Sequence, residues 1–218
     1  RDKKHPSDLF KLARAIALTE GKKYQQAHVI YSSLYKNKEN TEAKINDAIL
    51  SYQHLDQPAR ALKLFSSVIK NNSADTELKS ISSIHSGNIY LSQGKRVPAE
   101  SSYYTAIKYG GDKLLTLEEI ARNVRSSKHL SVLVNVIRHV TREHKGEGLM
   151  FALLGETLSQ DMNKHEDAIK AFADAIVLEP NKSEYHNGLG LVYYRLDRMN
   201  EALVLFSSAV ELNPNDSI

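Results

Sequence analysis

Small and apolar residues return along this chain with a period close to 34 residues, and the pattern occurs six times. Aligned copies begin at residues 8, 42, 80, 114, 148 and 183. Within each copy, apolar residues recur three and four positions apart, which is the spacing of an amphipathic helix. Each copy holds two such stretches. The pattern therefore predicts about six antiparallel helix pairs, twelve helices in all.

Three columns of the aligned copies have a regular side-chain size. The first helices share a column that is small in five of the six copies: Ala15, Ile49, Gly87, Ala121, Gly155 and Gly190. The second helices open on Ala27, Ala61, Ala99, Leu133, Ala168 and Ala202. Four residues later comes a large column: Tyr31, Phe65, Tyr103, Ile137, Phe172 and Phe206. Glycine inside a helix costs roughly 1 kcal/mol relative to alanine. We therefore expect the glycines where a neighbouring helix leaves no room for a side chain, and the large residues between one hairpin and the next.

The last copy shows the whole pattern most clearly. Its marked positions are Leu189, Gly190, Tyr193, Ala202, Phe206, Ala209 and Pro214. Leu-Gly-x-x-Tyr, Ala-x-x-x-Phe and a closing proline at a 34-residue period are the signature of tetratricopeptide repeats. The chain thus resembles that family over almost its whole length. The resemblance implies an all-α, right-handed superhelical solenoid in which each hairpin contacts mainly its neighbours.

The register divides the chain into four parts. They are a basic lead-in at 1–7, three repeats at 8–113, a degenerate fourth repeat at 114–147, and two further repeats at 148–216. The fourth repeat has Leu133 in the alanine column and Ile137 in the aromatic column. The chain starts abruptly at Arg1 and has no polar helix after the last repeat, where solenoids need a cap. We therefore expect it to be a segment of a longer protein.

The degenerate repeat is also rich in basic residues. Five of them form a candidate basic patch: Arg122, Arg125, Lys128, Arg138 and Arg142. The simplest interpretation is a solvated face of a degenerate repeat. A site for an acidic peptide and a bend in the solenoid are the alternatives.

Composition narrows the classes of function. The 29 Lys and Arg against 26 Asp and Glu leave a formal charge of +3, and the basic residues are scattered, so a nucleic-acid partner is not expected. No stretch approaches 18 consecutive apolar residues, so this segment is not expected to insert into a membrane. The absence of cysteine excludes disulfides and thiolate zinc sites. Cytoplasmic, luminal and secreted locations all remain compatible with this composition.

Catalytic and metal-binding patterns are missing from the segment. There is no Gly-x-Ser-x-Gly elbow and no phosphate-binding loop. His139, Glu143 and His144 come nearest to a metal-site spacing, but the third side chain points away from the shared face of the other two. We therefore expect no catalytic residue, no metal and no cofactor here.

The resemblance also implies where a partner binds. In this family the first helices of successive hairpins line a concave groove that holds an extended peptide or a helix. The matching groove residues are Asn46, Gln53, Ile84, Asn88, Asn187, Leu191, Tyr194 and Arg195, with Leu50 and Leu91 beside them. Asparagine amides suit this role because they both donate and accept hydrogen bonds to a peptide backbone. Asn88 and Asn187 are the preferred individual candidates.

Two known groove chemistries of the family are not matched. The carboxylate clamp that binds chaperone tails is absent, because its slots hold residues such as Leu12, Asp47 and His85. The asparagine ladder of the sugar-transferase type is absent too. Its slot, the sixth position of each repeat, holds Ala13, Asp47, His85 and Gly188.

The sequence therefore predicts a protein-interaction scaffold that binds a peptide or helix of a partner protein in its groove. The alternative is a substrate-docking or regulatory arm of a larger enzyme, including a membrane-anchored one, whose catalytic part lies outside this chain. Self-association through the uncapped ends or the fourth repeat is a third alternative.

Overall fold

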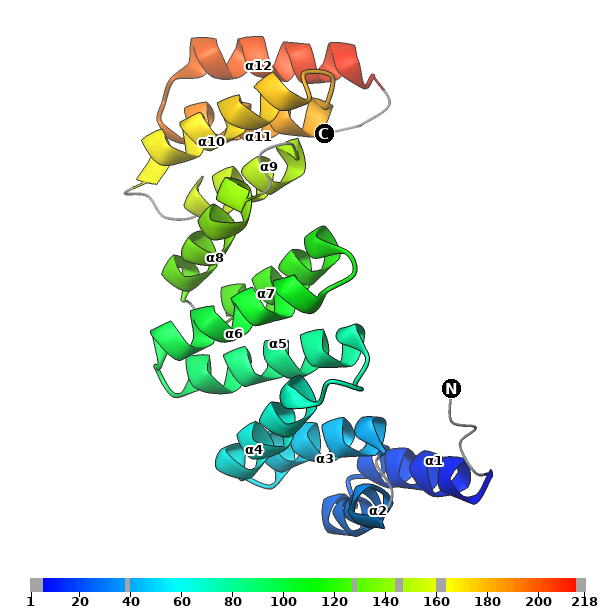
Figure 1. Cartoon of the computed structure of the whole chain (residues 1–218). Coiled ribbons are helices and arrows are strands. Elements are labelled where there is room, and N and C mark those ends of the chain that lie inside the picture. Colours follow the sequence, from blue (N-terminus) through cyan, green and yellow to red (C-terminus); the bar gives the residue numbers. More distant parts are fainter. Residues whose placement is uncertain (1–5, 38–39, 127–128, 144–146, 160–163, 215–218) are drawn as a thin grey trace. The chain divides into compact units, whose positions relative to one another are not determined.

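The structure is a computed structural model of the chain, and it describes residues 6–37, 40–126, 129–143, 147–159 and 164–214. These residues form twelve α-helices and no strand (Figure 1), which confirms the predicted all-α class. The helices fall into two compact units, residues 1–127 and 128–218. The boundary lies inside the fourth repeat.

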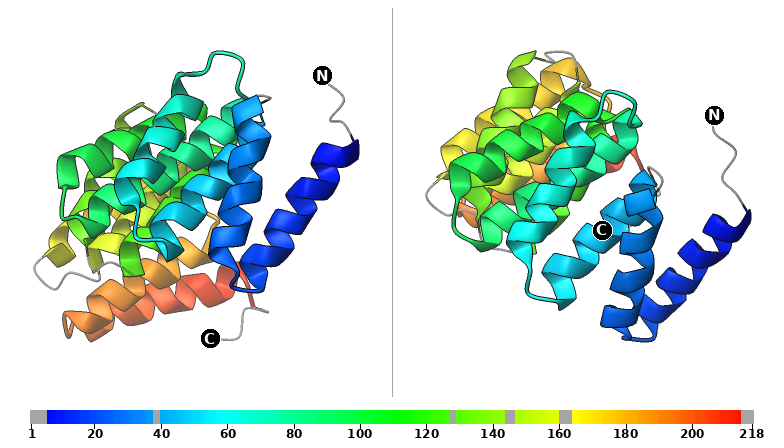
Figure 2. Two further views of the ribbon diagram at one scale, coloured as in Figure 1. Left: turned by 90° about the horizontal axis from the view of Figure 1, so that it is seen from below. Right: turned by 60° about the horizontal axis from the view of Figure 1, so that its bottom comes forward.

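Unit 1 contains the first seven helices. They are α1 (Pro6–Glu20), α2 (Tyr24–Asn37), α3 (Thr41–His54), α4 (Pro58–Lys70), α5 (Thr76–Ser92), α6 (Arg96–Tyr109) and α7 (Lys113–Ser126). Consecutive helices pair as α1 with α2, α3 with α4 and α5 with α6. The second helix of each pair also packs on the first helix of the next, and α3 lies beside α5. Figure 2 shows this succession from two further directions.

Unit 2 contains the other five helices. They are α8 (Leu130–Glu143), α9 (Gly148–Ser159), α10 (His165–Leu178), α11 (Ser183–Arg195) and α12 (Met199–Leu212). Here α9 pairs with α10 and α11 pairs with α12, while α8 packs on α9 and α9 lies beside α11. The predicted hairpin architecture is therefore present in both units.

The turns inside the hairpins share a backbone feature. Lys22, Asp56, Gly94 and Asp197 all have a positive φ, between 52° and 70°. Each of them is the fifteenth residue of its repeat. Glycine adopts this left-handed conformation freely, whereas a lysine or aspartate is less favourable there. The turn geometry is thus imposed by the two helices that it joins.

The alanine column and five of the six large residues are buried. All six residues of the alanine column are buried, as are Tyr31, Phe65, Tyr103, Ile137 and Phe172. A Cβ on Gly155 would lie 2.6 Å from Phe172 Cδ2, and one on Gly190 would lie 2.7 Å from Phe206 Cε1. Each phenylalanine ring thus fills the space that a side chain on the glycine of the same hairpin would need. Phe172 also fills the space toward the next hairpin, as predicted, since a Cβ on Gly188 of α11 would lie 2.5 Å from Phe172 Cε1.

Candidate functional site

A pocket of about 280 Å³ opens on unit 1 between α1, α2 and α3. It is lined by Ile16, Thr19, Glu20, Tyr31, Asn46, Ile49, Leu50, Gln53 and His54. Apolar side chains from α1 and α3 form much of its wall, and amide, hydroxyl, carboxylate and imidazole groups surround them. Two of the predicted groove residues, Asn46 and Gln53, line this pocket.

The local sequence explains how α3 presents these two amides. The helix begins at Thr41, where Asn40 Oδ1 accepts a hydrogen bond from the backbone N–H of Ala43. Asn46 and Gln53 are seven residues apart, so they lie on the same face two turns from each other. Leu50 lies between them and is buried, which anchors this face against the first hairpin. The amides therefore project from a packed helix rather than from a loop.

Hydrogen bonds connect the pocket to α5. Gln53 Nε2 donates to Tyr52 OH at 3.1 Å, and Tyr52 OH lies 2.8 Å from His85 Nδ1. The His85 ring stacks on Phe65, with ring centres 5.6 Å apart and planes 9° apart. Sequence analysis singled out His85 only as a mismatch to known groove chemistries. In the structure it joins α3, α4 and α5.

The His85 imidazole makes the stability of unit 1 depend on pH. Burial lowers the pKa of His85 to about 4, whereas a histidine in an unfolded chain has a pKa of about 6.5. Folding favours the neutral ring. Its contribution to stability is therefore complete when the pH is above the pKa of His85 in the unfolded chain. The contribution is lost as the pH falls toward the pKa of His85 in the folded chain. We expect a total loss of up to about 3 kcal/mol.

The measurement is denaturant unfolding at about pH 7 and about pH 4.5, in the wild type and in His85→Gln. Carboxylates also titrate in this range, so the informative quantity is the difference between the two proteins. The wild type should lose more stability than the variant. Equal losses would contradict a role for His85.

Asn88, a preferred groove candidate, already has a structural partner. Tyr103 OH donates a hydrogen bond to Asn88 Oδ1 at 2.8 Å. The Tyr103 ring is buried beneath α5, against Gly87. This hydrogen bond satisfies a buried hydroxyl, so truncating Asn88 would disturb the core as well as any ligand contact.

Ile84 needs a correction. It was expected to line the groove, but its side chain is only 2% exposed and belongs to the core of unit 1. Leu50 and Leu91 are buried as well. Leu50 packs with Leu12 and Ala15 in the core of the first hairpin.

The four predicted groove residues of unit 2 all lie on α11. Asn187 is half-buried, whereas Leu191 and Tyr194 are exposed. Arg195 is exposed, but its NH1 donates to the backbone oxygen and the hydroxyl of Ser159, both at 3.2 Å. Arg195 therefore ties α11 to the end of α9.

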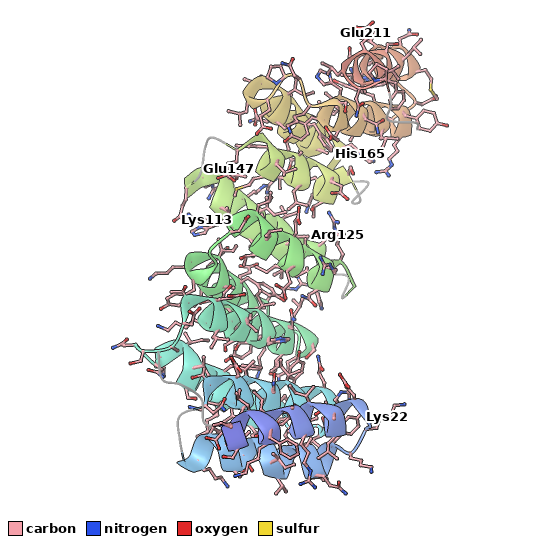
Figure 3. The ribbon with its side chains drawn as sticks, turned by 90° about the vertical axis from the view of Figure 1, so that its right-hand side faces the viewer. Lys22, Lys113, Arg125, Glu147, His165 and Glu211 are labelled. Atoms are coloured by element: carbon pink, nitrogen blue, oxygen red, sulfur yellow. The ribbon has the colours of Figure 1, made fainter. Side chains whose placement is uncertain are left out.

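The basic residues of the fourth repeat belong to separate units. Arg122 and Arg125 lie on α7 of unit 1 (Figure 3 labels Arg125), whereas Arg138 and Arg142 lie on α8 of unit 2. Arg138 NH2 donates to Asp167 Oδ2 at 2.7 Å, so this charge is paired with α10. Lys128 lies outside the described residues.

A buried ionic cluster was not anticipated from the sequence. Asp47 on α3 is completely buried, and its carboxylate contacts three side chains. Tyr35 OH donates to Oδ2 at 2.7 Å and Arg60 NH2 donates to the same oxygen at 2.9 Å, while His28 Nδ1 lies 2.6 Å from Oδ1. These partners come from α2 and α4. The residue types of this slot gave no signal, since it also holds Ala13, His85 and Gly188.

No three His, Asp or Glu side chains in the described part of the chain come together in a way that could hold a metal ion. His139 Nε2 lies 3.6 Å from Glu143 Oε1, and His144 is outside the described part of the chain. No helix in that part is both long and apolar enough to cross a membrane.

The comparisons with known proteins bear on the fold. Residues 158–217 match the sequence model of the tetratricopeptide repeat family. The C-terminal part of a TPR repeat-containing protein from Cytophaga hutchinsonii has a similar structure, with a TM-score of 0.51 and 17% identity, covering 92% of this chain and 78% of that one. No curated protein matches the chain in sequence.

Two other solved structures are similar at lower scores. MamA from Desulfovibrio magneticus RS-1 is 20% identical, with a TM-score of 0.48, over 81% of this chain and 97% of that chain. YrrB, described as a TPR protein with an unusual peptide-binding site, is 14% identical, with a TM-score of 0.48, over 85% and 93% of the two chains.

Residues 158–217 match the tetratricopeptide repeat family, and the fold is similar to that of a solved TPR repeat-containing protein. The family's sequence model covers the end of α9 and all of α10 to α12, and the same hairpin architecture is present in both units.

Proposed function

We propose that the chain is a protein-interaction module and that it binds an extended peptide segment of a partner protein at the pocket between α1, α2 and α3. The pocket itself is the observation that carries this proposal. It lies on the first helices of successive hairpins and is lined by two amides that the sequence pattern had singled out, Asn46 and Gln53.

The size and lining of the pocket indicate what it can hold. Its volume of about 280 Å³ lies just below the roughly 300–1,000 Å³ typical of small-molecule sites. Its apolar wall, formed by Ile16, Ile49 and Leu50, suits an apolar side chain. Burial of such a side chain contributes about 1.5–3 kcal/mol. A single apolar residue of a peptide matches both the volume of the pocket and its apolar wall.

The amides of Asn46 and Gln53 provide the polar contacts with the bound peptide. Asn46 and Gln53 each carry a donor and an acceptor, which is the complement of a peptide bond. They are two helical turns apart, roughly 10 Å along α3, which is close to the length of three residues in an extended chain. A segment that lies along α3 can therefore reach both amides while its apolar side chain enters the pocket.

The test is selection of a phage-displayed random peptide library on the wild-type chain, followed by affinity measurements with the selected synthetic peptides. We expect the peptides to share an apolar residue. Replacing both amides, Asn46→Ala/Gln53→Ala, should weaken binding about 10- to 100-fold, because one or two hydrogen bonds of about 1 kcal/mol or more are lost.

Asn187→Ala is the matched control, since it removes the same kind of amide from α11 of unit 2. It should leave the affinity unchanged. Peptides that bind the double variant as tightly as the wild type would contradict the proposal. Loss of binding in Asn187→Ala alone would place the site on unit 2 instead.

A further inference from the structure

The lining of the pocket between α1, α2 and α3 contains a buried hydroxyl that lacks a full hydrogen bond. Tyr31 of α2 and Thr19 of α1 both line the pocket, and Tyr31 is only 2% exposed. Tyr31 OH and Thr19 Oγ1 lie 3.4 Å apart, whereas two hydroxyls that share a good hydrogen bond are about 2.5–3.0 Å apart. Tyr31 OH has no other polar partner in the part of the chain that the structure describes. The hydroxyl end of this ring is therefore available to a ligand in the pocket.

The third repeat shows how the same hydroxyl is satisfied elsewhere. Tyr103 is the twenty-fourth residue of its repeat, as Tyr31 is of the first. Tyr103 OH donates to Asn88 Oδ1 at 2.8 Å. Asn88 is the ninth residue of its repeat, and the ninth residue of the first repeat is Ile16, which offers no acceptor. The first repeat thus keeps the buried hydroxyl but lacks the amide that satisfies it in the third.

The second repeat has no such hydroxyl. Its twenty-fourth and ninth residues are Phe65 and Leu50, both apolar. A buried hydroxyl without a full hydrogen bond lowers stability, so a phenylalanine would also be the more stable choice at Tyr31. Residues that break such a local rule are most often explained by function. A ligand that completes the hydrogen bonding of Tyr31 provides that explanation.

The two hydroxyls of the pocket have different roles in hydrogen bonding. Thr19 Oγ1 donates its proton to the backbone oxygen of Ala15 at 3.0 Å, so toward the pocket it can only accept. Burial raises the pKa of Tyr31, so the phenol keeps its proton and can donate it. A ligand group that both accepts and donates complements this pair. A hydroxyl has both capacities, whereas the N–H of an indole only donates.

The rest of the pocket suits an aromatic ring. Its apolar wall consists of Ile16, Ile49 and Leu50. Its volume of about 280 Å³ exceeds the roughly 150 Å³ of an apolar cavity that is known to bind benzene. The hydroxyl of a serine or threonine would leave most of this wall uncovered. A ring that carries a hydroxyl, which is a phenol, matches both the wall and the two hydroxyls.

We propose that the pocket binds a phenol ring, supplied by a tyrosine of the bound peptide, whose hydroxyl accepts a hydrogen bond from Tyr31 OH and donates one to Thr19 Oγ1. The tyrosine rests on the proposed function, because it names the residue with which a peptide is anchored. The phenol site itself is a property of the pocket and can be tested without a peptide.

The first test uses p-cresol, which is the side chain of tyrosine, and toluene, which lacks only the hydroxyl. NMR titrations of the whole chain should show that p-cresol binds at the pocket about 3- to 10-fold more tightly than toluene, because it gains the hydrogen bonds. Tyr31→Phe and Thr19→Val each remove one hydroxyl with little change of shape. Both should weaken the binding of p-cresol about 3- to 10-fold and leave that of toluene unchanged.

Tyr103→Phe is the matched control, since it removes the hydroxyl at the same position of the third repeat. It should bind both probes as the wild type does, and circular dichroism checks that all variants are folded. Equal affinities of the two probes for the wild type would overturn the phenol site. A preference for p-cresol that survives in both Tyr31→Phe and Thr19→Val would overturn it as well.

The second test uses the phage-selected peptides whose binding depends on Asn46 and Gln53. They should share a tyrosine, and replacing it by phenylalanine should weaken binding to the wild type about 3- to 10-fold but not binding to Tyr31→Phe. Selected peptides that share a different apolar residue would overturn the tyrosine anchor and leave the proposed function standing. A preference for p-cresol without any peptide that depends on these two amides would overturn the proposed function and support the phenol site alone.

Discussion

Replacing Asp47 by alanine should lower the free energy of unfolding of unit 1 by about 1–3 kcal/mol. The carboxylate is completely buried and satisfies Tyr35 and Arg60, with His28 beside it. Its removal leaves a guanidinium and a phenol beside a cavity without their acceptor. Donors that lose their acceptor cost free energy for this reason, although the Arg60 side chain, which is 37% exposed, can turn toward solvent. Because the partners lie on α2 and α4, the first two hairpins should separate more readily.

Hydrogen exchange measured by mass spectrometry resolves this effect by segment. Peptides from α2, α3 and α4 should lose protection in Asp47→Ala, while those from unit 2 should keep it, since repeats depend mainly on their neighbours. Asp174→Ala, at an exposed aspartate on α10, is the control for the loss of one carboxylate. A change in unfolding free energy below about 1 kcal/mol, the usual range for surface ion pairs, would show that the cluster does not hold these hairpins together.

The second large effect concerns Phe172 in unit 2, where we expect Phe172→Ala to cost about 3–5 kcal/mol. The ring is buried between two helices, and it occupies the side-chain space of Gly155 on α9 and of Gly188 on α11. Truncation would leave a cavity between two hairpins that neither glycine can fill. Such cavities account for the largest losses among core substitutions.

Two further variants make this prediction specific. Phe206→Ala should cost less, because Phe206 is only half-buried. Gly155→Ala should destabilise the chain, although alanine in place of a helical glycine normally stabilises by roughly 1 kcal/mol. The reason is that the new Cβ would lie 2.6 Å from Phe172 Cδ2. Denaturant unfolding measures the free energy of unfolding of all three variants. A stabilising Gly155→Ala, or equal losses for the two phenylalanines, would contradict this account of the packing.

Much of the fold could be predicted from the periodicity alone. The positions of the helices and the burial of the alanine column are confirmed, because they depend on residues three to seven positions apart on one helix. The left-handed turn residue was harder to predict. Only Gly94 marks that position by its residue type, and Lys22, Asp56 and Asp197 adopt the same conformation without such a signal.

The candidate site was predictable only in part. Asn46 and Gln53 were selected from the sequence, and they line the pocket. Thr19 and Tyr31, which also line it, were not selected, since their approach to α3 depends on how the first two hairpins pack. Ile84 was placed on the wrong surface, because periodicity assigns a helix face but not the depth to which a neighbouring helix covers it.

The sequence by itself determined the repeat length and the twelve helices, because both are encoded within one repeat of about 34 residues. The tertiary structure alone decided which residues from different repeats meet. It brought His28, Tyr35 and Arg60 around Asp47, stacked His85 on Phe65, and formed a pocket from three helices. These contacts depend on the exact approach of neighbouring helices, which side-chain volumes set jointly and no single segment specifies.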